Sequence, residues 1–174
     1  MATLVLPNPS LVVLVGAAGS GKSTFAARWF AADDVLSSDA YRAIVTGDES
    51  DQAATRSAFS ILHREVARRL AAGRPVVVDA TNVERAARRA LIARARAAAV
   101  PAVAIVLNLP PTLVHERNRG RTGRIVDPSV VDRHLDRLAR TIARRELAEE
   151  GFDDVVVLRS AADVDGVSVE WRTP

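Results

Sequence analysis

The sequence predicts a three-layer α/β domain, in which a parallel central sheet of about five strands is covered by helices on both faces. Short apolar runs alternate with helical segments along the whole chain, an order that is typical of parallel sheets. Leu11–Val15 is continuously apolar and ends at a glycine-rich loop, as expected for a buried central strand. With 174 residues the chain has the size of one domain, so we expect residues 1–174 to fold as a single unit.

The N-terminal half is interpreted as a short strand, the central strand, a helix, a third strand and a long helix. These elements are expected at Thr3–Leu6, Leu11–Val15, Lys22–Phe30, Val35–Ser37 and Asp51–Ala72. Pro7 and Pro9 keep the first strand at an edge, because proline cannot donate a hydrogen bond to a sheet. The long helix carries one apolar stripe and stops at Gly73, a residue suited to the left-handed turn after a helix.

The C-terminal half continues the alternation of strands and helices. Strands are expected at Val76–Asp79, Val103–Asn108 and Asp154–Leu158, and helices at Glu84–Ala99, Thr112–Arg119 and Pro128–Glu150. Thr81 with Glu84 has the spacing of a capping box at a helix start. Asp127 followed by Pro128 is typical of an N-cap residue and the first helical position.

The composition excludes several classes of site. The chain contains no cysteine, which rules out disulfides and thiolate metal sites and favours a reducing compartment. No apolar run reaches the length of a membrane span, and we expect a cytoplasmic protein without membrane partners. His63, His115 and His134 lack metal-ligand spacing and are expected on helix surfaces. Lys22 is the only lysine among 24 basic residues, at a position that favours a slim ammonium over a guanidinium.

Residues 16–23 match the pattern G-x-x-x-x-G-K-[ST] of a phosphate-binding P-loop. Glycines allow backbone N–H groups to surround phosphates, and the helix that begins near Lys22 adds its positive N-terminal end. Lys22 is expected to reach the β- and γ-phosphates, and the Ser23 hydroxyl to bind Mg²⁺. The alternative, a glycine-rich turn without a ligand, is disfavoured because an apolar strand precedes the motif and a helix follows it. The predicted nucleotide-binding residues are Gly16, Gly19, Ser20, Gly21, Lys22, Ser23 and Thr24.

Asp39 and Arg42 are the candidates for binding the acceptor of the phosphoryl group. They follow the strand Val35–Ser37, and ligands of parallel sheets gather outside the carboxyl ends of the strands. The Asp39 carboxylate could accept the proton of an attacking hydroxyl, and Arg42 could hold an anionic part of the acceptor. The alternative makes Asp39 a helix N-cap and Arg42 a solvated side chain.

Asp79 ends a predicted core strand beside the P-loop strand. An acid at this place is expected to hold Mg²⁺ through water. The alternative is that Asp79, Thr81 and Asn82 only end the strand and cap the next helix. We favour the metal role for Asp79 and the capping role for Thr81.

The segment from about residue 115 to residue 127 is predicted to form a mobile lid. It carries Arg117, Arg119, Arg121 and Arg124 against one glutamate, with Gly120 and Gly123 between them. Such arginines could close on the phosphates and stabilise the charge of the transferring group. The alternative is a solvated basic helix end. Trp29, Tyr41 and Phe59 are too few and scattered for a base-stacking platform, so a nucleic acid would be held near its end.

Taken together, these motifs resemble the N-terminal kinase domain of the bacterial polynucleotide 5′-kinase/3′-phosphatase repair enzymes, within the adenylate-kinase-like P-loop NTPases. The resemblance covers essentially the whole chain. It is carried by the P-loop, by Ser37–Asp39 with Arg42, by Val77–Asn82, by Asn108–Pro110 and by Glu116–Asn118 with Arg121 and Thr122.

The resemblance implies an ATP-dependent polynucleotide 5′-hydroxyl kinase that repairs DNA or RNA ends, with Mg²⁺ or Mn²⁺ as its metal. Asp39 would be the general base, Lys22 and Ser23 would bind ATP·Mg²⁺, and Arg42 would grip the phosphate 3′ of the accepting nucleoside. Arg117 and Arg121, with Arg124, would act on the phosphates from the lid. In that family phosphatase and ligase-like modules follow the kinase, and the enzyme forms dimers. The chain is interpreted as an excised domain or a stand-alone relative.

Two other functions stay open. A small-metabolite kinase would share the donor site, the base and the lid, but a neutral metabolite offers Arg42 no phosphate. A nucleotide-gated switch would bind partners and phosphorylate no acceptor; the sequence contains no Asn-Lys-x-Asp guanine motif, because the one lysine lies in the P-loop.

Overall fold

The computed structural model describes residues 2–46, 55–122 and 125–172. Its strands are β1 (Ala2–Leu6), β2 (Leu11–Val15), β3 (Val35–Ser37), β4 (Val76–Asp79), β5 (Ala102–Leu107), β6 (Asp154–Leu158) and β7 (Val167–Trp171). Its helices are α1 (Lys22–Trp29), α2 (Ser38–Thr46), α3 (Thr55–Ala71), α4 (Arg85–Ala97), α5 (Pro111–Arg119), α6 (Pro128–Ala143), α7 (Glu146–Glu150) and α8 (Ala161–Gly166), with a short 3₁₀ turn at Ala32–Asp34.

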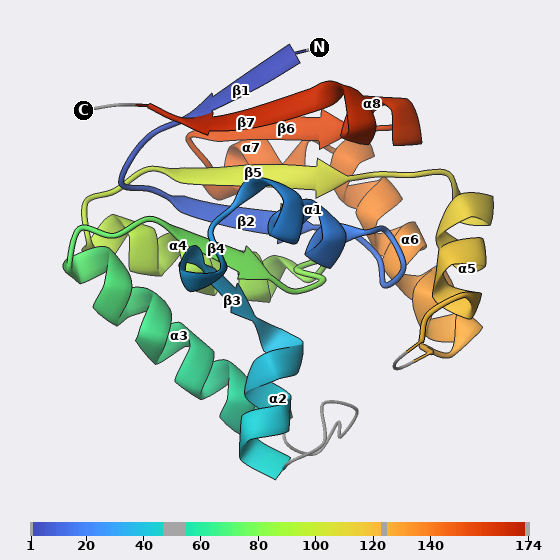
Figure 1. The fold of residues 1–174 in the computed structure, drawn as a ribbon, viewed down its shortest axis with the longest axis horizontal. Helices are drawn as coiled ribbons and strands as arrows, with labels where there is room; N and C mark the ends of the chain where they lie inside the picture. The colour runs from blue at the N-terminus through green and yellow to red at the C-terminus, as the bar shows by residue number, and fades with distance from the viewer. Residues whose placement is uncertain (1, 47–54, 123–124, 173–174) are drawn as a thin grey trace.

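Five strands form the central sheet in the order β3-β4-β2-β5-β6, and every neighbouring pair is parallel (Figure 1). The predicted α/β fold and the number of sheet strands are therefore confirmed. The middle strand β2 is fully buried over its whole length, as its apolar run predicts. Alternate β2 side chains enter opposite cores, because successive residues of a strand point to opposite faces of the sheet.

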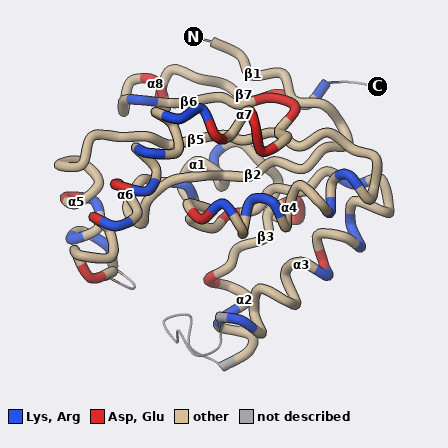
Figure 2. Tube along the Cα trace, turned by 180° about the vertical axis from the view of Figure 1, so that it is seen from behind, with Lys and Arg blue, Asp and Glu red and all other residues tan. Residues whose placement is uncertain are grey.

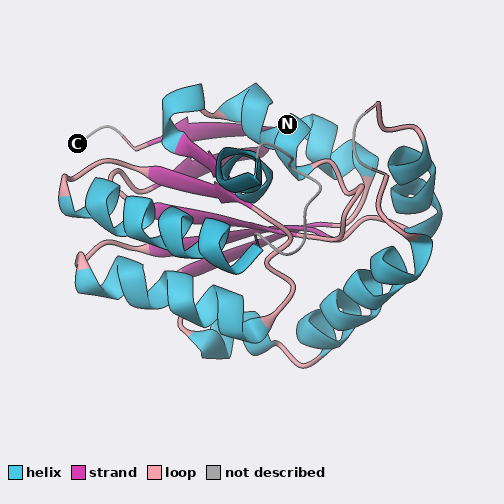
Figure 3. Cartoon of the chain, turned by 90° about the horizontal axis from the view of Figure 1, so that it is seen from below, coloured by secondary structure: helices cyan, strands magenta, loops and turns pink. Residues whose placement is uncertain are grey.

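The sheet has a different cover on each face. Leu11, Val13 and Val15 pack in a core that also holds apolar residues of α3, α4, α6 and α7. Val12 and Leu14 pack on the other face against α1 and the β1–β7 pair, and Val164 of α8 borders that core. Figure 3 shows helices on both sides of the strands. The three-layer arrangement is thus present, with a small second sheet as part of one outer layer.

Because of the strand register, the segments that follow β2, β3 and β4 all begin at the same edge of the sheet. Asp79, the last residue of β4, pairs with Leu14 of β2 on one side and with Ser37 of β3 on the other. The loop after β2, the start of α2 after β3 and the turn after β4 therefore leave the sheet at the same level. This edge is where a parallel sheet is expected to carry its ligand site.

Four details of the sequence analysis need correction. The helix predicted at Pro128–Glu150 is two helices, because Arg145 takes a left-handed backbone conformation (φ 56°) between α6 and α7. Thr81 and Glu84 form no capping box: Glu84 is the N-cap of α4, and no side chain caps it. The helices α2 and α8 and the strand β7 were not predicted. The first strand, β1, pairs with β7 in a two-stranded sheet apart from the central one.

Two predicted helix ends are confirmed. Asp127 caps α6, because its carboxylate accepts a hydrogen bond from the Ser129 N–H at 2.8 Å. Gly73 has a φ of +70°, and the N–H of Arg74 donates to the carbonyl of Arg69 at 3.1 Å, which closes α3. Part of the helix expected at Asp51–Ala72, namely residues 51–54, lies outside the described residues.

In the described parts of the chain, no helix combines the length and the apolar character needed to cross a membrane.

Candidate active site

The P-loop joins β2 to α1, and its glycines allow the close turn. Gly19 and Gly21 have φ values of +88° and +91°, in the left-handed region that side chains disfavour. A Cβ at Gly19 would lie 2.6 Å from the carbonyl oxygen of Val114, which is backbone of α5 and cannot step aside. Helix α1 then begins at Lys22, with Gly21 as its N-cap. The loop thus leads directly into a helix N-terminus, a feature that suits anionic phosphates.

Lys22 places the only ammonium group of the chain over this loop. The side chain is buried, and its Nζ donates to the carbonyls of Gly16 and Ala17 at 3.0 and 2.9 Å. Burial lowers the pKa of Lys22 from 10.5 to about 8; the carboxylate of Asp79 raises it, and Arg121 lowers it further. The ammonium is therefore held by neutral carbonyls in a desolvated place, where a phosphate would be a better partner.

The predicted Mg²⁺ ligands are the carboxylate of Asp79, at the end of β4, and the hydroxyl of Ser23, at the start of α1. The Asp79 side chain is buried, with 6 % of the residue exposed, whereas Ser23 is exposed at the start of α1. Both line the same cleft. No group of three or more His, Cys, Asp or Glu side chains suited to a metal occurs among the described residues. A hydroxyl and a carboxylate fit Mg²⁺, which keeps several waters and is completed by substrate phosphates.

Asp39 and Arg42 lie on α2, one helical turn apart, and form an ion pair. Asp39 does not cap the helix: Ser37 takes that role, since its hydroxyl accepts from the Ala40 N–H at 3.4 Å. The Asp39 side chain keeps 42 % of its surface exposed, while Arg42 is buried at 8 %. A buried guanidinium next to an accessible carboxylate is unlike the solvated surface arginine of the alternative interpretation. Both residues line the cleft.

The arginines of the predicted lid separate into distinct environments. Arg117 of α5 and Arg121 line the cleft, and Arg117 Nη1 lies 3.5 Å from the carbonyl oxygen of Ser20 in the P-loop. Arg119 is exposed and does not line the cleft. Arg124, predicted as a further phosphate contact, lies outside the described residues together with Gly123.

Asn118 closes the base of the loop that follows α5. Its Nδ2 donates to the Val126 carbonyl at 2.7 Å, and its Oδ1 accepts from the Val126 N–H at 3.1 Å. The residue is buried at 1 % exposure. In the segment predicted as a lid, residues 115–119 thus form the end of α5, which Asn118 ties to Val126, and the closing movement of a lid stays a prediction.

One cleft of about 650 Å³ joins these parts. It brings together most of the predicted site residues, namely Gly19, Gly21, Lys22, Ser23, Thr24, Asp39, Arg42, Asp79, Arg117 and Arg121. Gly16 and Ser20 are buried beneath it. The cleft also has walls that sequence reasoning missed: Phe59 of α3, Val130 and His134 of α6, and Arg28, Val164 and Asp165 on the side of α1 and α8. No local motif marks these residues, because only the packing of distant helices brings them to the cleft.

Comparison with known proteins identifies the architecture. A model of the AAA domain family matches residues 11–147. No curated protein matches the chain. Among solved structures, the Pnkp1/Rnl/Hen1 RNA repair complex contains a chain of 24 % identity with a TM-score of 0.69; the match covers 78 % of this chain and 46 % of that one. This protein thus spans about half the length of that relative.

Two further solved structures are matched over most of both chains. A gluconokinase from Sinorhizobium meliloti has 21 % identity and a TM-score of 0.56, with 92 % of this chain and 87 % of that chain covered. The APS kinase CysC of Mycobacterium tuberculosis, in complex with AMPPNP and APS, has 15 % identity and a TM-score of 0.56, with coverage of 92 % and 93 %. At these identities the likeness establishes the fold, which is that of P-loop kinases.

Proposed function

Because the chain belongs to the AAA domain family and folds as a P-loop kinase, we propose that it is a polynucleotide 5′-hydroxyl kinase. It would transfer the γ-phosphate of ATP to the 5′-hydroxyl end of DNA or RNA. One observation carries this proposal: the exposed carboxylate of Asp39 and the buried guanidinium of Arg42 line the same cleft as the P-loop. A hydroxyl acceptor that carries a nearby phosphate would use both groups.

The donor end of the cleft would hold ATP. Backbone N–H groups of residues 16–24 would surround its phosphates, and Lys22 would turn from the Gly16 and Ala17 carbonyls to the β- and γ-phosphates. Ser23 and, through water, Asp79 would hold Mg²⁺, which supplies charge neutralisation for the transferring phosphoryl group. The depressed pKa of Lys22 favours this exchange of partners, since an anion restores the stability of the charged amine.

The transfer itself needs few protein groups. Asp39 would accept the proton of the 5′-hydroxyl as its oxygen attacks the γ-phosphorus, while the bond from that phosphorus to the β–γ bridging oxygen breaks and ADP leaves. Arg117 and Arg121 would stabilise the negative charge of the moving phosphoryl group from the side of α5. The closing of the loop after α5 as a lid is part of the proposal.

The burial of Arg42 and its ion pair with Asp39 favour a phosphorylated acceptor over a neutral one. It is buried and paired with Asp39, so its charge is already directed into the cleft. A phosphate 3′ of the accepting nucleoside would share this guanidinium, which would release the Asp39 carboxylate to face the incoming hydroxyl. A sugar without an anionic group next to its hydroxyl would leave the pair unchanged.

The apolar walls of the cleft support an acceptor that is held by its terminal base. Phe59, Val126 and Val130 contribute apolar walls to the cleft, which suit a planar base better than a polyhydroxylated sugar. Figure 2 shows the charged residues of the outer helices: Arg residues alternate with Asp along α6, whereas α4 carries Arg without Asp or Glu and α3 carries four Arg and one Glu.

A small-metabolite kinase is the second candidate, and one observation favours it. The gluconokinase matches nearly the full length of this chain, whereas the match to the RNA repair complex covers less than half of that relative. Association with phosphatase and ligase-like modules, and a homodimer, are proposals that rest on the resemblance of the sequence motifs to the repair-kinase family.

The role of Arg42 tests the proposal directly. Transfer from ATP should be efficient to a 3′-phosphorylated nucleoside and poor to the same nucleoside without the phosphate. Arg42→Ala should lower kcat/KM for the phosphorylated acceptor about ten- to a hundred-fold, the cost of one charge-assisted hydrogen-bonding partner, and leave the bare nucleoside nearly unchanged. Equal losses on both acceptors would remove Arg42 from this role. A sugar that outperforms every nucleotide would replace the proposed function with the metabolite kinase.

A further inference from the structure

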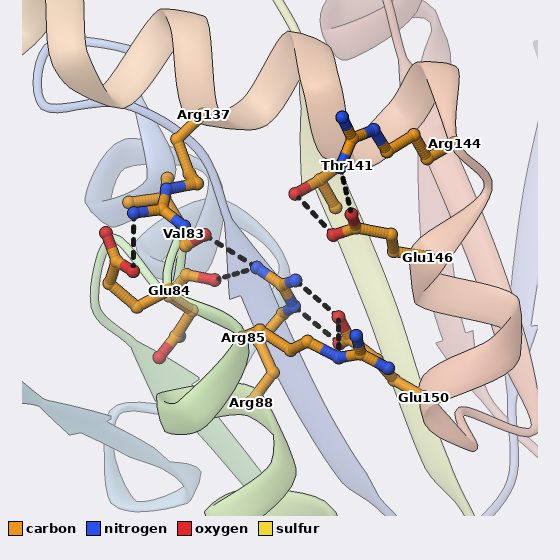
Figure 4. Close-up of polar contacts among 10 residues, drawn as sticks. Val83, Glu84, Arg85, Arg88, Arg137, Thr141, Arg144, Glu146 and Glu150 are labelled. Atoms are coloured by element: carbon orange, nitrogen blue, oxygen red, sulfur yellow. Dashed lines mark hydrogen bonds and ion pairs between the residues drawn. The ribbon is translucent and has the colours of Figure 1, made fainter.

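A fully buried ion pair joins the start of α4 to the end of α7. Arg88 and Glu150 have completely buried side chains and meet in a two-pronged contact: Nε donates to Oε2 at 2.7 Å and Nη2 to Oε1 at 2.5 Å. Figure 4 shows the guanidinium between the Glu150 carboxylate and the backbone around Val83. Arg85, which is half exposed, lies 3.7 Å from the same carboxylate and lines its outer edge.

The stability of the fold does not explain why charges occupy this place. Removing two charges from water is costly, and replacing a buried ion pair by apolar residues of similar size is often neutral or stabilising. Both side chains are fully buried, and Leu91 of α4 and Leu147 of α7, three residues along the chain from each partner, belong to the apolar core. A positional role, which an apolar pair could not perform, accounts for the charges better.

The remaining nitrogen of Arg88 holds the turn between β4 and α4. Nη1 donates to the carbonyls of Asn82 and Val83 at 3.0 and 2.8 Å. Asn82 has a φ of 49°, a left-handed conformation that is uncommon for residues other than glycine. The guanidinium thus fixes a turn whose backbone would otherwise have other conformations available.

The opposite side of this turn touches the P-loop. The Asn82 Nδ2 donates to the Leu14 carbonyl at 2.8 Å, and the Gly16 N–H donates to the Thr81 carbonyl at 2.9 Å. Asp79 and Thr81, at the start of the turn, line the cleft. A continuous series of hydrogen bonds therefore leads from Glu150 through Arg88 and the turn to the first residue of the phosphate loop.

We infer that Arg88 is a positioning residue of the phosphate site, oriented by Glu150, which makes α7 part of the frame of the active site. Arg88 sets where Asp79 and Thr81 lie relative to the P-loop and touches neither substrate. This inference rests on the proposed phosphoryl transfer and is independent of the acceptor. Because the ATP phosphates are held by the loop itself, the turnover number should suffer more than ATP binding.

Arg88→Lys provides the main test. The ammonium of a lysine can form an ion pair with Glu150. It cannot at the same time donate hydrogen bonds to the two backbone carbonyls of the turn in the fixed planar geometry of a guanidinium. We expect kcat to fall about 10- to 100-fold, because a displacement of Asp79 and Thr81 by about an ångström relative to the P-loop has an effect of this size. The KM for ATP should change less than about threefold. The matched control is Glu65→Gln, which breaks a well-formed ion pair with Arg68 and Arg69 on α3 outside the cleft. It should keep the kcat of the wild type.

Thermal unfolding of each variant separates positioning from loss of folded protein. An Arg88→Lys enzyme that is folded and has the kcat of the wild type would overturn the inference, as would a loss of kcat that disappears when activity is corrected for the folded fraction.

If Arg88→Lys does not fold, the double variant Arg88→Met/Glu150→Leu removes both buried charges together. A folded double variant with low kcat supports the inference, and wild-type kcat in it overturns it. Failure of the wild type on oligonucleotides would affect only the proposed acceptor, because kcat is measured on any acceptor that the wild type phosphorylates.

Discussion

Lys22 and its neighbours were predictable from the sequence because the phosphate loop is a local motif with a local cause. The loop, its glycines and the start of α1 lie within ten residues, so spacing alone specifies the geometry. Asp39 and Arg42 were predicted at the correct edge of the sheet. Their ion pair joins residues i and i+3 of α2, a local contact that follows once a helix forms there. The contrast between a buried Arg42 and an accessible Asp39 depends on how α2 packs against α3 and was not predictable.

The first prediction at the residue scale concerns the uptake of a proton by Lys22 when ATP binds. Burial holds the pKa of Lys22 at about 8, so the amine is charged below pH 8 and loses its proton as the pH rises through that value. Phosphates stabilise the charged form, so binding of ATP should raise the pKa and draw in a proton. At pH 8 we expect an uptake of about half a proton per nucleotide, and almost none from this group at pH 6.5.

Calorimetric titrations in buffers of different ionisation enthalpy measure this uptake. Lys22→Arg is the control, because arginine stays charged over the whole range and takes up no proton at this position. The same uptake in the wild type and in Lys22→Arg would show that another group is responsible.

The second prediction at this scale separates binding from chemistry at Asp39. Asp39→Asn keeps an oxygen for Arg42 but loses the base, so transfer should fall about 10²-fold or more while the affinity for ATP·Mg²⁺ stays near that of the wild type. Steady-state kinetics and a direct nucleotide titration check both halves. A collapse of ATP affinity would assign Asp39 to the donor or metal site.

At the scale of elements, the sequence predicted the strands of the central sheet better than the helix ends. Each sheet strand is a short apolar run with few alternatives, and β2, β3, β4 and β6 have their predicted bounds. The break between α6 and α7 carries no glycine or proline signal. It follows from the left-handed Arg145, which turns Leu147 into the core and Glu150 toward Arg88. Tertiary packing decides such a break.

The prediction for α5 and the loop after it compares the arginines that line the cleft, Arg117 and Arg121, with Arg119, which does not. Arg117→Ala or Arg121→Ala should lower kcat about 10²-fold, with a smaller effect on the KM for ATP, because these groups act on charge that develops during transfer. Arg119→Ala is the internal control, since Arg119 lies on the same segment but points outside the cleft lining. Equal and mild effects at all three positions would favour a solvated basic helix end.

At the scale of the whole molecule, the wall of the cleft that we propose holds the acceptor could not be predicted, because it is assembled from helices far apart in the chain. Phe59 belongs to α3, and Val130 and His134 belong to α6. Sequence reasoning counted Phe59 among scattered aromatic residues and placed His134 on a helix surface. Only the packed molecule brings both to the cleft that also holds Asp39.

This assembly predicts a preference for acceptors that carry a base. If a terminal base stacks on Phe59, Phe59→Ala should lower kcat/KM for a 5′-OH oligonucleotide by about 5- to 150-fold, as a stacking energy of about 1–3 kcal/mol requires. An oligonucleotide with an abasic 5′ end should be poor already and lose little more. Phe59→Trp keeps a stacking surface and should retain activity. Equal losses of both acceptors in Phe59→Ala would assign Phe59 to packing alone.

The most direct test of the central claim is a competition for labelled phosphate from ATP among a 5′-OH oligonucleotide, a nucleoside and gluconate in one reaction. We predict that the label is found on the 5′ end of the oligonucleotide, and that Asp39→Asn, purified in the same way, transfers almost none. Label on gluconate or on the nucleoside, with the oligonucleotide unmodified, would contradict the account, and release of labelled inorganic phosphate alone would indicate a nucleotide-gated switch.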